Sequence, residues 1–166
     1  LKIQTFNKYF EIYSIYRNAD FLLSIFDDCI YNLIINNEDC DKYKTDLNEC
    51  NRKIINLFSQ IEILFHEEVH ERLIRFQQII VSHKVLLANI ININTNELYR
   101  ETIEKLRSTN NIYEFYKILK IDMPNSYIYF DVNGYTPKCR HQYNICKSKD
   151  LMNLLKRECE LYKQNS

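Results

Sequence analysis

The stretch that decides the fold runs from Thr45 to Ile93 and reads TDLNECNRKIINLFSQIEILFHEEVHERLIRFQQIIVSHKVLLANIINI. Its apolar residues recur at intervals of three and four over about ten turns, which is the period of an amphipathic α-helix. The pattern predicts one long central helix, roughly 65–70 Å in length at about 1.5 Å per residue. Because such a helix exceeds a domain of this size, we expect a kink or break near Ser82-His83.

The apolar stripe of this segment is the predicted core of the protein. Side chains spaced by three or four residues share one face of a helix, so they can be buried together against other helices. We expect the following side chains to be buried on one face of the shared helix: Phe58, Ile61, Phe65, Val69, Leu73, Phe76 and Ile80.

Neither Gly nor Pro occurs in residues 1–123, which favours helices over a sheet with its punctuated turns. An apolar stripe over residues 6–34 predicts one or two helices before a polar turn at 36–44. Thr95 is the predicted cap of the next helix, and a short helix is expected from Ile112. The predicted fold class is therefore mainly α, an antiparallel helical bundle built on the long central helix.

The character of the chain changes after Asp122. Asn133-Gly134 follows a run of strand-forming residues and is the preferred pair for a type I′ turn, so it predicts a small β-hairpin. Ser148 is a predicted cap for a final helix. We expect a single domain over residues 1–166, in which 1–121 form the bundle and 122–166 form the hairpin and final helix packed on it.

The composition is that of an ordinary globular protein, with 46% apolar residues and a formal net charge of zero. Abundant Asn, Ile and Tyr indicate an AT-rich genome. The charge is unevenly distributed, because residues 27–50 hold seven acidic residues and two lysines, whereas 138–157 hold six basic residues and one aspartate. We interpret both segments as solvated faces.

No segment is predicted to span a membrane. The apolar run Phe21–Ile35 contains Asp27 and Asp28, and the run Ile79–Ile93 is too short and contains charged side chains. We expect an intracellular location and leave a secreted one open, since a chain beginning at Leu1 fits either a removed signal peptide or a trimmed terminus.

The one recognisable chemical motif is His66-Glu67-Glu68-Val69-His70, which matches the pattern H-E-x-x-H. On a helix both imidazoles project from one face and can bind one Zn²⁺, while the intervening Glu can serve as general base. Over these five residues the chain resembles the zincin metallopeptidases. The resemblance implies a zinc ion held by His66 and His70, with Glu67 as the base. A third ligand would come from one of four side chains: Glu97, Glu101, Glu104 or His83.

The sequence departs from the zincin pattern at Glu68 and Glu71, where the family usually has uncharged residues, and no strand is predicted ahead of the motif. These carboxylates make the turn anionic and hydrated, whereas a catalytic zinc needs a shielded cleft. We therefore prefer the interpretation that His66 and His70 lie on an exposed or flanking face, pair with carboxylates such as Glu62 and Glu67, and bind no metal.

The six Cys follow no spacing that identifies a disulfide framework. Cys40 and Cys50 flank the expected start of the long helix and could form a disulfide in an oxidising compartment. A structural zinc is the alternative at the C-terminal end, where thiolates and an imidazole gather in the hairpin and final helix. Its ligands would be Cys139, His141, Cys146 and Cys159.

The basic stretch at 138–157 supports a further alternative, contact with nucleic acid or the ribosome. Cations bind phosphates, and the neighbouring Tyr135 and Tyr143 could stack on bases. The basic residues concerned are Lys138, Arg140, Lys147, Lys149, Lys156 and Arg157.

The prediction for function is a non-enzymatic helical interaction or scaffold protein that binds a protein partner or a larger complex without a cofactor. Gly134 is the only glycine, so no phosphate-binding or dinucleotide loop can form. The zinc peptidase and the RNA- or ribosome-associated factor are the alternatives.

Overall fold

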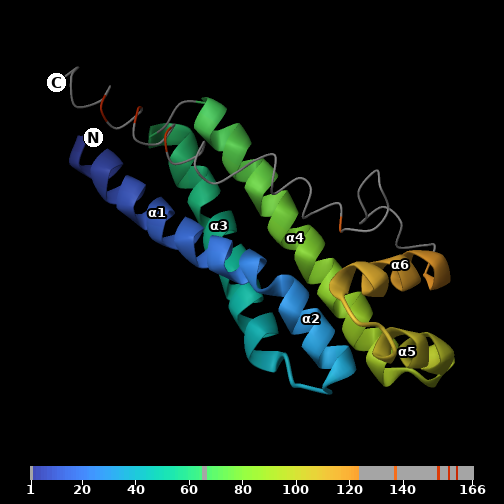
Figure 1. The fold of residues 1–166 in the computed structure, drawn as a ribbon. Helices are drawn as coiled ribbons and strands as arrows, with labels where there is room; N and C mark the ends of the chain where they lie inside the picture. The colour runs from blue at the N-terminus through green and yellow to red at the C-terminus, as the bar shows by residue number, and fades with distance from the viewer. Residues whose placement is uncertain are drawn as a thin grey trace.

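The computed structural model describes residues 2–64 and 67–123, together with four isolated positions: Pro137, Asn153, Arg157 and Glu160. This part of the chain is mainly helical, which confirms the mainly α part of the predicted fold class (Figure 1). The predicted hairpin at Asn133-Gly134 lies outside the described residues. The elements are α1 (Lys2–Ser24), α2 (Phe26–Ile35), α3 (Asp41–Leu64), α4 (Glu67–Thr95), the short 3₁₀-helix η1 (Glu97–Tyr99), α5 (Arg100–Arg107) and α6 (Ile112–Asp122).

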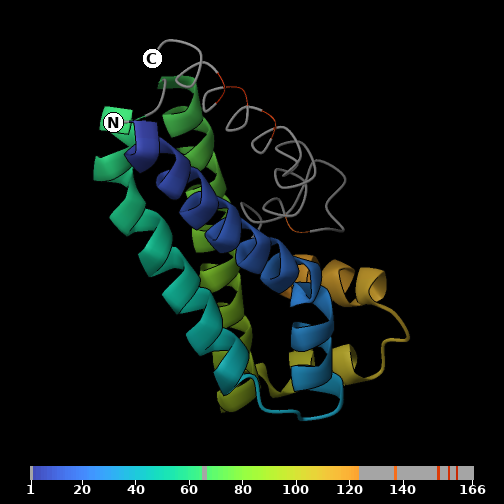
Figure 2. The ribbon, with the colours of Figure 1, turned by 90° about the vertical axis from the view of Figure 1, so that its left-hand side faces the viewer.

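The prediction of one long helix over Thr45–Ile93 is wrong, because the segment forms two antiparallel helices, α3 and α4 (Figure 2). The Gln77 side-chain amide donates to Asn51 Oδ1 at 3.3 Å, and the rings of His70 and Phe58 lie 5.7 Å apart. Asn51 thus faces Gln77, and Phe58 faces His70, so the two helices run in opposite directions. The expected break near Ser82-His83 is also wrong, since α4 continues through it.

The apolar stripe explains this reversal. A single straight helix would leave half of its stripe without a partner, whereas two helices that pack antiparallel bury their stripes against each other. Leu73, Phe76 and Ile80 are buried on α4 as predicted, and Phe58 on α3 packs partly buried against the core. These residues therefore line the contact between two helices, and they do not share one face of a single helix as predicted. The side chains of Ile61, Phe65 and Val69 lie outside the described residues.

The core lies where α1 and α2 cross the α3–α4 pair, as Figures 1 and 2 show from two sides. Contacts link α1 to α3 and α4, and α2 to α4. Within the described residues no helix combines the length and the apolar character of a membrane span. The helices α1, α2, α3 and α4 together form the main layer of the protein. The side chains at its centre are almost completely buried: Leu23, Phe26, Ile30, Leu47, Ile54, Ile79 and Ile80.

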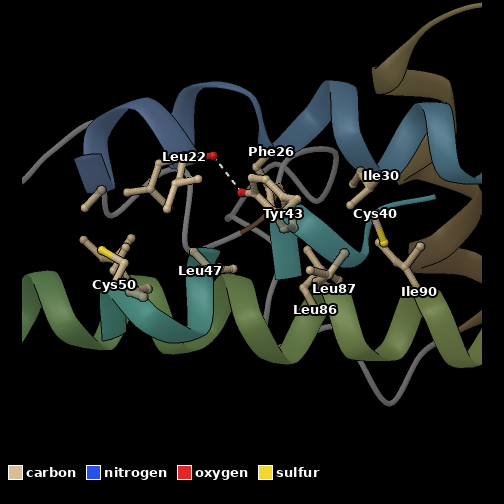
Figure 3. Packing of buried hydrophobic residues seen from close by; sticks show 14 of the residues in the cluster. Leu22, Phe26, Ile30, Cys40, Tyr43, Leu47, Cys50, Leu86, Leu87 and Ile90 are labelled. Carbon is tan, nitrogen blue, oxygen red and sulfur yellow. Dashed lines mark hydrogen bonds between the residues drawn. The ribbon is translucent and has the colours of Figure 1, made fainter. Parts of the chain in front are cut away.

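A kink at Ile25 separates α1 from α2, although no Gly or Pro stands near it. Ile25 has φ −99° and ψ 1°, outside the usual helical geometry. The buried Tyr43 hydroxyl, from α3, donates a 2.6 Å hydrogen bond to the carbonyl of Leu22, one of the last carbonyls of α1 (Figure 3). A side chain that enters the helical hydrogen-bond ladder is a recognised cause of a kink. A hydrogen bond from another helix therefore accompanies the kink.

The pair α5–α6 is attached to α2 by polar bonds. The Tyr31 hydroxyl donates to the carbonyl of Thr109, and Arg107 Nε donates to the carbonyl of Ile34, both at 3.1 Å. The Tyr116 hydroxyl of α6 donates to the carboxylate of Asp27. These bonds hold a short helical pair against a helix of the main layer.

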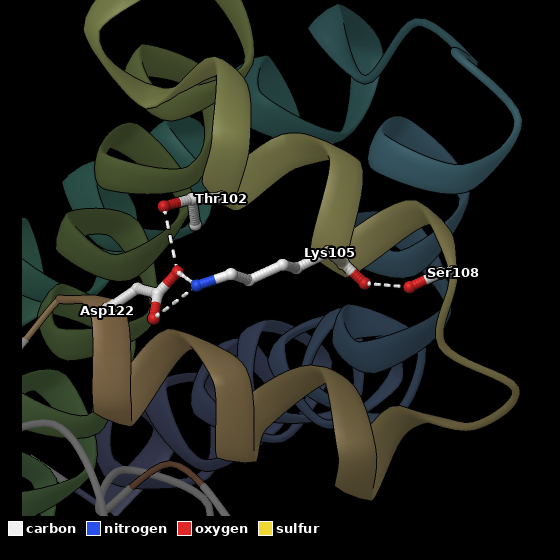
Figure 4. A network of polar contacts seen from close by, with 4 residues as sticks. All are labelled: Thr102, Lys105, Ser108 and Asp122. Carbon is white, nitrogen blue, oxygen red and sulfur yellow. Dashed lines mark hydrogen bonds and ion pairs between the residues drawn. The ribbon is translucent and has the colours of Figure 1, made fainter.

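Polar bonds also join α5 to the end of α6. Asp122 accepts hydrogen bonds from Thr102 Oγ1 at 3.1 Å and from Lys105 Nζ at 3.0 Å (Figure 4). The break expected before Ile112 is confirmed, with the side chain of Asn111 capping α6 by accepting from the Glu114 amide.

The expected cap at Thr95 is wrong, because Thr95 ends α4 and its hydroxyl donates back to the carbonyls of Ile91 and Asn92. The neighbouring Asn96 caps η1 instead, with its side chain accepting from the Leu98 amide. A hydroxyl that can bond within its own helix competes with its use as a cap.

Candidate binding groove

The predicted zinc motif falls at the junction of α3 and α4. His66 lies outside the described residues, so the distance between His66 and His70 lies outside them too. Glu67 is exposed at the first position of α4, and His70 is partly buried with its ring packed edge-on against Phe58. His70 therefore contributes to the contact between α3 and α4.

The proposed third ligands lie far from His70. Glu97, Glu101 and Glu104 follow the opposite end of α4, which at 1.5 Å per residue is about 35–40 Å away. His83 is fully buried about 20 Å along the same helix. Its Nδ1 donates to the carbonyl of Ile79 at 2.8 Å, and its ring packs edge-on against Phe26 at 4.6 Å. The described residues contain no group of three or more His, Cys, Asp or Glu that could hold a metal ion.

Cys40 and Cys50, the pair that could form a disulfide in an oxidising compartment, are free thiols in this structure. The Lys44 amide donates to the carbonyl of Cys40, which places Cys40 at the start of the helical ladder of α3. Cys50 stands about 15 Å further along that helix, whereas the Cα atoms of a disulfide lie within about 7 Å. The proposed zinc ligands Cys139, His141, Cys146 and Cys159 lie outside the described residues.

The basic stretch is represented by one described residue, Arg157, which is helical and exposed. The other five cations lie outside the described residues, so contact with nucleic acid stays a prediction: Lys138, Arg140, Lys147, Lys149 and Lys156.

A surface groove of about 380 Å³ lies beside the α1–α2 kink and opposite the start of α3. Leu22, Ile25 and Tyr43 give it an apolar lining, and the phenyl ring of Phe21 is 59% exposed beside them. The kink positions this groove, since the Tyr43–Leu22 bond that accompanies it joins two of the lining residues. The remaining lining residues are Asp28, Cys29, Asn32, Glu38, Asp39, Cys40, Lys42 and Asp46.

The groove is bordered by four carboxylates and one lysine. They come from α2, from the loop after it and from α3, so negative charge surrounds the apolar lining. Burial raises the pKa of the Cys29 thiol, and the neighbouring Cys40, Asp28 and Glu38 raise it further. The pKa of Cys40 is raised by burial and by Asp41 and Asp39. Both thiols are therefore neutral at neutral pH, and the charged groups that line the groove are four carboxylates and one lysine.

Sequence reasoning found the acidity of residues 27–50 but missed the groove. The signal for the charge is the run of acidic residues. No comparable signal marks the groove at Phe21, because Phe10 on the same helix is equally apolar and equally exposed but does not line it.

Comparison with known proteins returns no match: no family model, no curated protein and no solved structure matches this chain.

Proposed function

We propose that this protein is a non-enzymatic helical interaction module that binds a protein partner through the groove at the α1–α2 kink. The observation that carries the proposal is the placement of a half-exposed aromatic ring, Phe21, beside an apolar hollow that carboxylates surround. An apolar centre within a polar rim is the usual anatomy of a protein–protein interface.

The lining chemistry favours a protein over a nucleic acid. Large aromatic side chains in a hollow supply much of the binding energy at protein interfaces. The surrounding Asp28, Glu38, Asp39 and Asp46 would repel phosphates, which dominate the affinity of nucleic acids for proteins.

The two alternatives from the sequence receive less support. A zinc peptidase needs a third ligand within about 2.0–2.2 Å of the metal, and the four candidate ligands stand about 20 Å or more from His70 along the chain's helices. The nucleic-acid alternative rests on the basic residues of 138–157, and Arg157 is the one among them that the structure describes.

A peptide-display selection tests the proposal. A library of random 15-residue peptides is selected on the wild-type protein, and the enriched peptides are measured on Phe21→Ser and Phe10→Ser. Both rings lie on α1 and are mostly exposed, at 59% and 63%, but only Phe21 lines the groove. We expect the enriched peptides to lose at least about tenfold in affinity on Phe21→Ser and to keep it on Phe10→Ser.

Circular dichroism checks that both variants stay helical, which we expect because exposed substitutions change stability by about 0.5 kcal/mol or less. A library that yields no binder, or binders that are insensitive to Phe21→Ser, would contradict the proposal. Equal losses on both variants would place the binding surface along α1 and away from the groove, which also contradicts it.

A further inference from the structure

We infer that the partner segment is a basic amphipathic helix, which sets a large apolar side chain against Phe21 and Tyr43 and directs lysines or arginines to the groove's carboxylates. This inference rests on the proposed function and names the chemistry of the partner. It follows from the charge of the groove, from its shape and from the backbone of the elements around it.

Charge complementarity carries the first step. Asp28 on α2, Glu38 and Asp39 in the loop, and Asp46 on α3 border the hollow, against the single cation of Lys42. A concave surface lined by one sign of charge concentrates its field and attracts ligands of the opposite sign. Asp41 and Lys44 stand next to the lining and are both exposed, so these two neighbouring charges offset each other and the negative charge comes from the lining residues themselves.

The shape of the groove carries the second step. Its α1–α2 wall extends from Phe21 to Asn32, which corresponds to about 16 Å at the helical rise. A partner helix of about ten residues has a similar length. The volume of about 380 Å³ is near the lower end of the range of about 300–1,000 Å³ for ligand pockets, so it suits one or two large side chains.

The backbone around the groove favours a helical partner over an extended one. An extended peptide gains affinity by pairing with the open edge of a sheet, and residues 2–64 and 67–123 offer no strand. Most of the groove wall is helical, so most of its backbone groups already bond within helical ladders, and only residues 38–40 of the lining belong to a loop. Side-chain contact is therefore the available mode, as when an amphipathic helix lies in a groove.

Two 15-residue peptides test the inference by fluorescence anisotropy. Both carry leucines at helical spacing, and their polar positions are all lysine in one and all glutamate in the other. We expect the lysine peptide to bind the wild-type protein at least about tenfold more tightly than the glutamate peptide, with the difference shrinking as salt is raised. Equal binding of both peptides would overturn the inference.

Charge variants locate the effect. We expect Asp28→Lys combined with Asp46→Lys to weaken the lysine peptide at least about tenfold. The matched control, Glu71→Lys combined with Glu104→Lys, changes the net charge equally at exposed positions outside the groove. An equal loss on the control would mean that overall charge alone attracts the peptide, which contradicts the inference.

A gain-of-affinity variant guards against loss through misfolding. Lys42 is exposed and is the one cation among the groove residues, so Lys42→Glu should tighten the lysine peptide by about threefold or more. Weaker or unchanged binding would count against the inference, because no loss of folding can produce the expected gain.

The chain's own basic stretch is the rival occupant. A variant with Gln in place of Lys138, Arg140, Lys147, Lys149, Lys156 and Arg157 should bind the lysine peptide as the wild type does. Binding by this variant alone would show that the chain fills its own groove, which overturns the inference of a separate partner.

The proposed function and this inference fail differently. Display-selected peptides that depend on Phe21 but lack basic residues would sustain the groove as an interface and refute its preference for basic helices. Absence of any Phe21-dependent peptide would refute both.

Discussion

Helix α2 takes part in two contacts that are built in different ways. Toward α3 and α4 it presents the fully buried Phe26, whose ring lies 6.3 Å from that of Tyr43 and 4.6 Å from that of His83. Toward α5 and α6 it presents polar groups, including the carboxylate of Asp27 and the hydroxyl of Tyr31. Both contacts bury apolar side chains, since the ring of Tyr31 lies 5.8 Å from that of the fully buried Phe115. The second contact adds directional hydrogen bonds from Tyr31 and to Asp27.

Buried apolar area and directional hydrogen bonds contribute to stability in different ways. Burial of apolar area stabilises in proportion to the area removed from water and tolerates small changes of orientation. A hydrogen bond contributes about 0.5–1.5 kcal/mol net, but a buried group left without its partner costs more. The main layer should therefore respond most to lost volume. The α5–α6 attachment, which combines buried apolar side chains with these bonds, should respond to the loss of single polar atoms as well.

The largest expected effect is the loss of volume in the main layer. Phe26→Ala should lower the free energy of unfolding by about 3–5 kcal/mol, because it removes a buried ring and leaves a cavity. Phe21→Ala is the matched control, since Phe21 lies on the preceding turn but is 59% exposed while Phe26 is 0% exposed. Urea unfolding followed by circular dichroism measures both. Similar losses in the two variants would refute the assignment of Phe26 to the core.

Some features of this layer can be predicted from local sequence patterns, and others cannot. The helical class and the break before Ile112 follow from local patterns, namely the absence of Gly and Pro and the capping Asn111. The separation of α3 from α4 does not, because the apolar period continues from Phe58 to Leu73 with no breaker residue between them. Periodicity records which face is apolar and does not record where the chain reverses.

The candidate groove needs information from further along the chain. The kink at Ile25 involves the hydroxyl of Tyr43, which stands on another helix, so the local sequence around Ile25 gives no sign of it. The acidity around Asp28 and Asp46 is visible in the sequence, but the apolar hollow that it surrounds appears only after the helices are packed.

A smaller effect is expected where polar bonds attach α6 to α2. Tyr116→Phe removes the hydroxyl that donates to the Asp27 carboxylate and keeps the buried ring in place. We expect a loss of about 1.5–3 kcal/mol, the range for hydrogen bonds to charged groups. Tyr113→Phe on the same helix is the control, because Tyr113 is 64% exposed.

Urea unfolding measures the loss in these tyrosine variants, and amide hydrogen exchange locates it. Faster exchange in α5 and α6, with α3 and α4 unchanged, is the expected pattern for Tyr116→Phe, because the bond attaches only the short pair. A uniform increase across all helices would mean that the two contacts of α2 are not separable as described.

The smallest effect expected concerns pH and a buried thiol of the hydrophobic core, Cys50. Cys50 on α3 is 1% exposed, and burial raises the pKa of its thiol from 9.0 to about 11, with Lys53 acting weakly in the opposite direction. The thiol is deprotonated first in the unfolded chain as pH rises, so the folded chain holds the extra proton between these two values. Its contribution to stability is complete below about pH 9 and is lost as the pH approaches 11.

Comparison with Cys50→Ala isolates this contribution. We expect the wild type to lose on the order of 1–2 kcal/mol more than Cys50→Ala between pH 8 and 11, measured by urea unfolding under reducing conditions. The cavity left by the substitution lowers stability at every pH, so only the difference in pH dependence reports on the thiol. Cys29→Ala is the control, because Cys29 is only partly buried and should change the pH dependence less. An identical pH dependence in wild type and Cys50→Ala would mean that Cys50 is accessible to water, so the core around it would be less dry than its 1% exposure indicates.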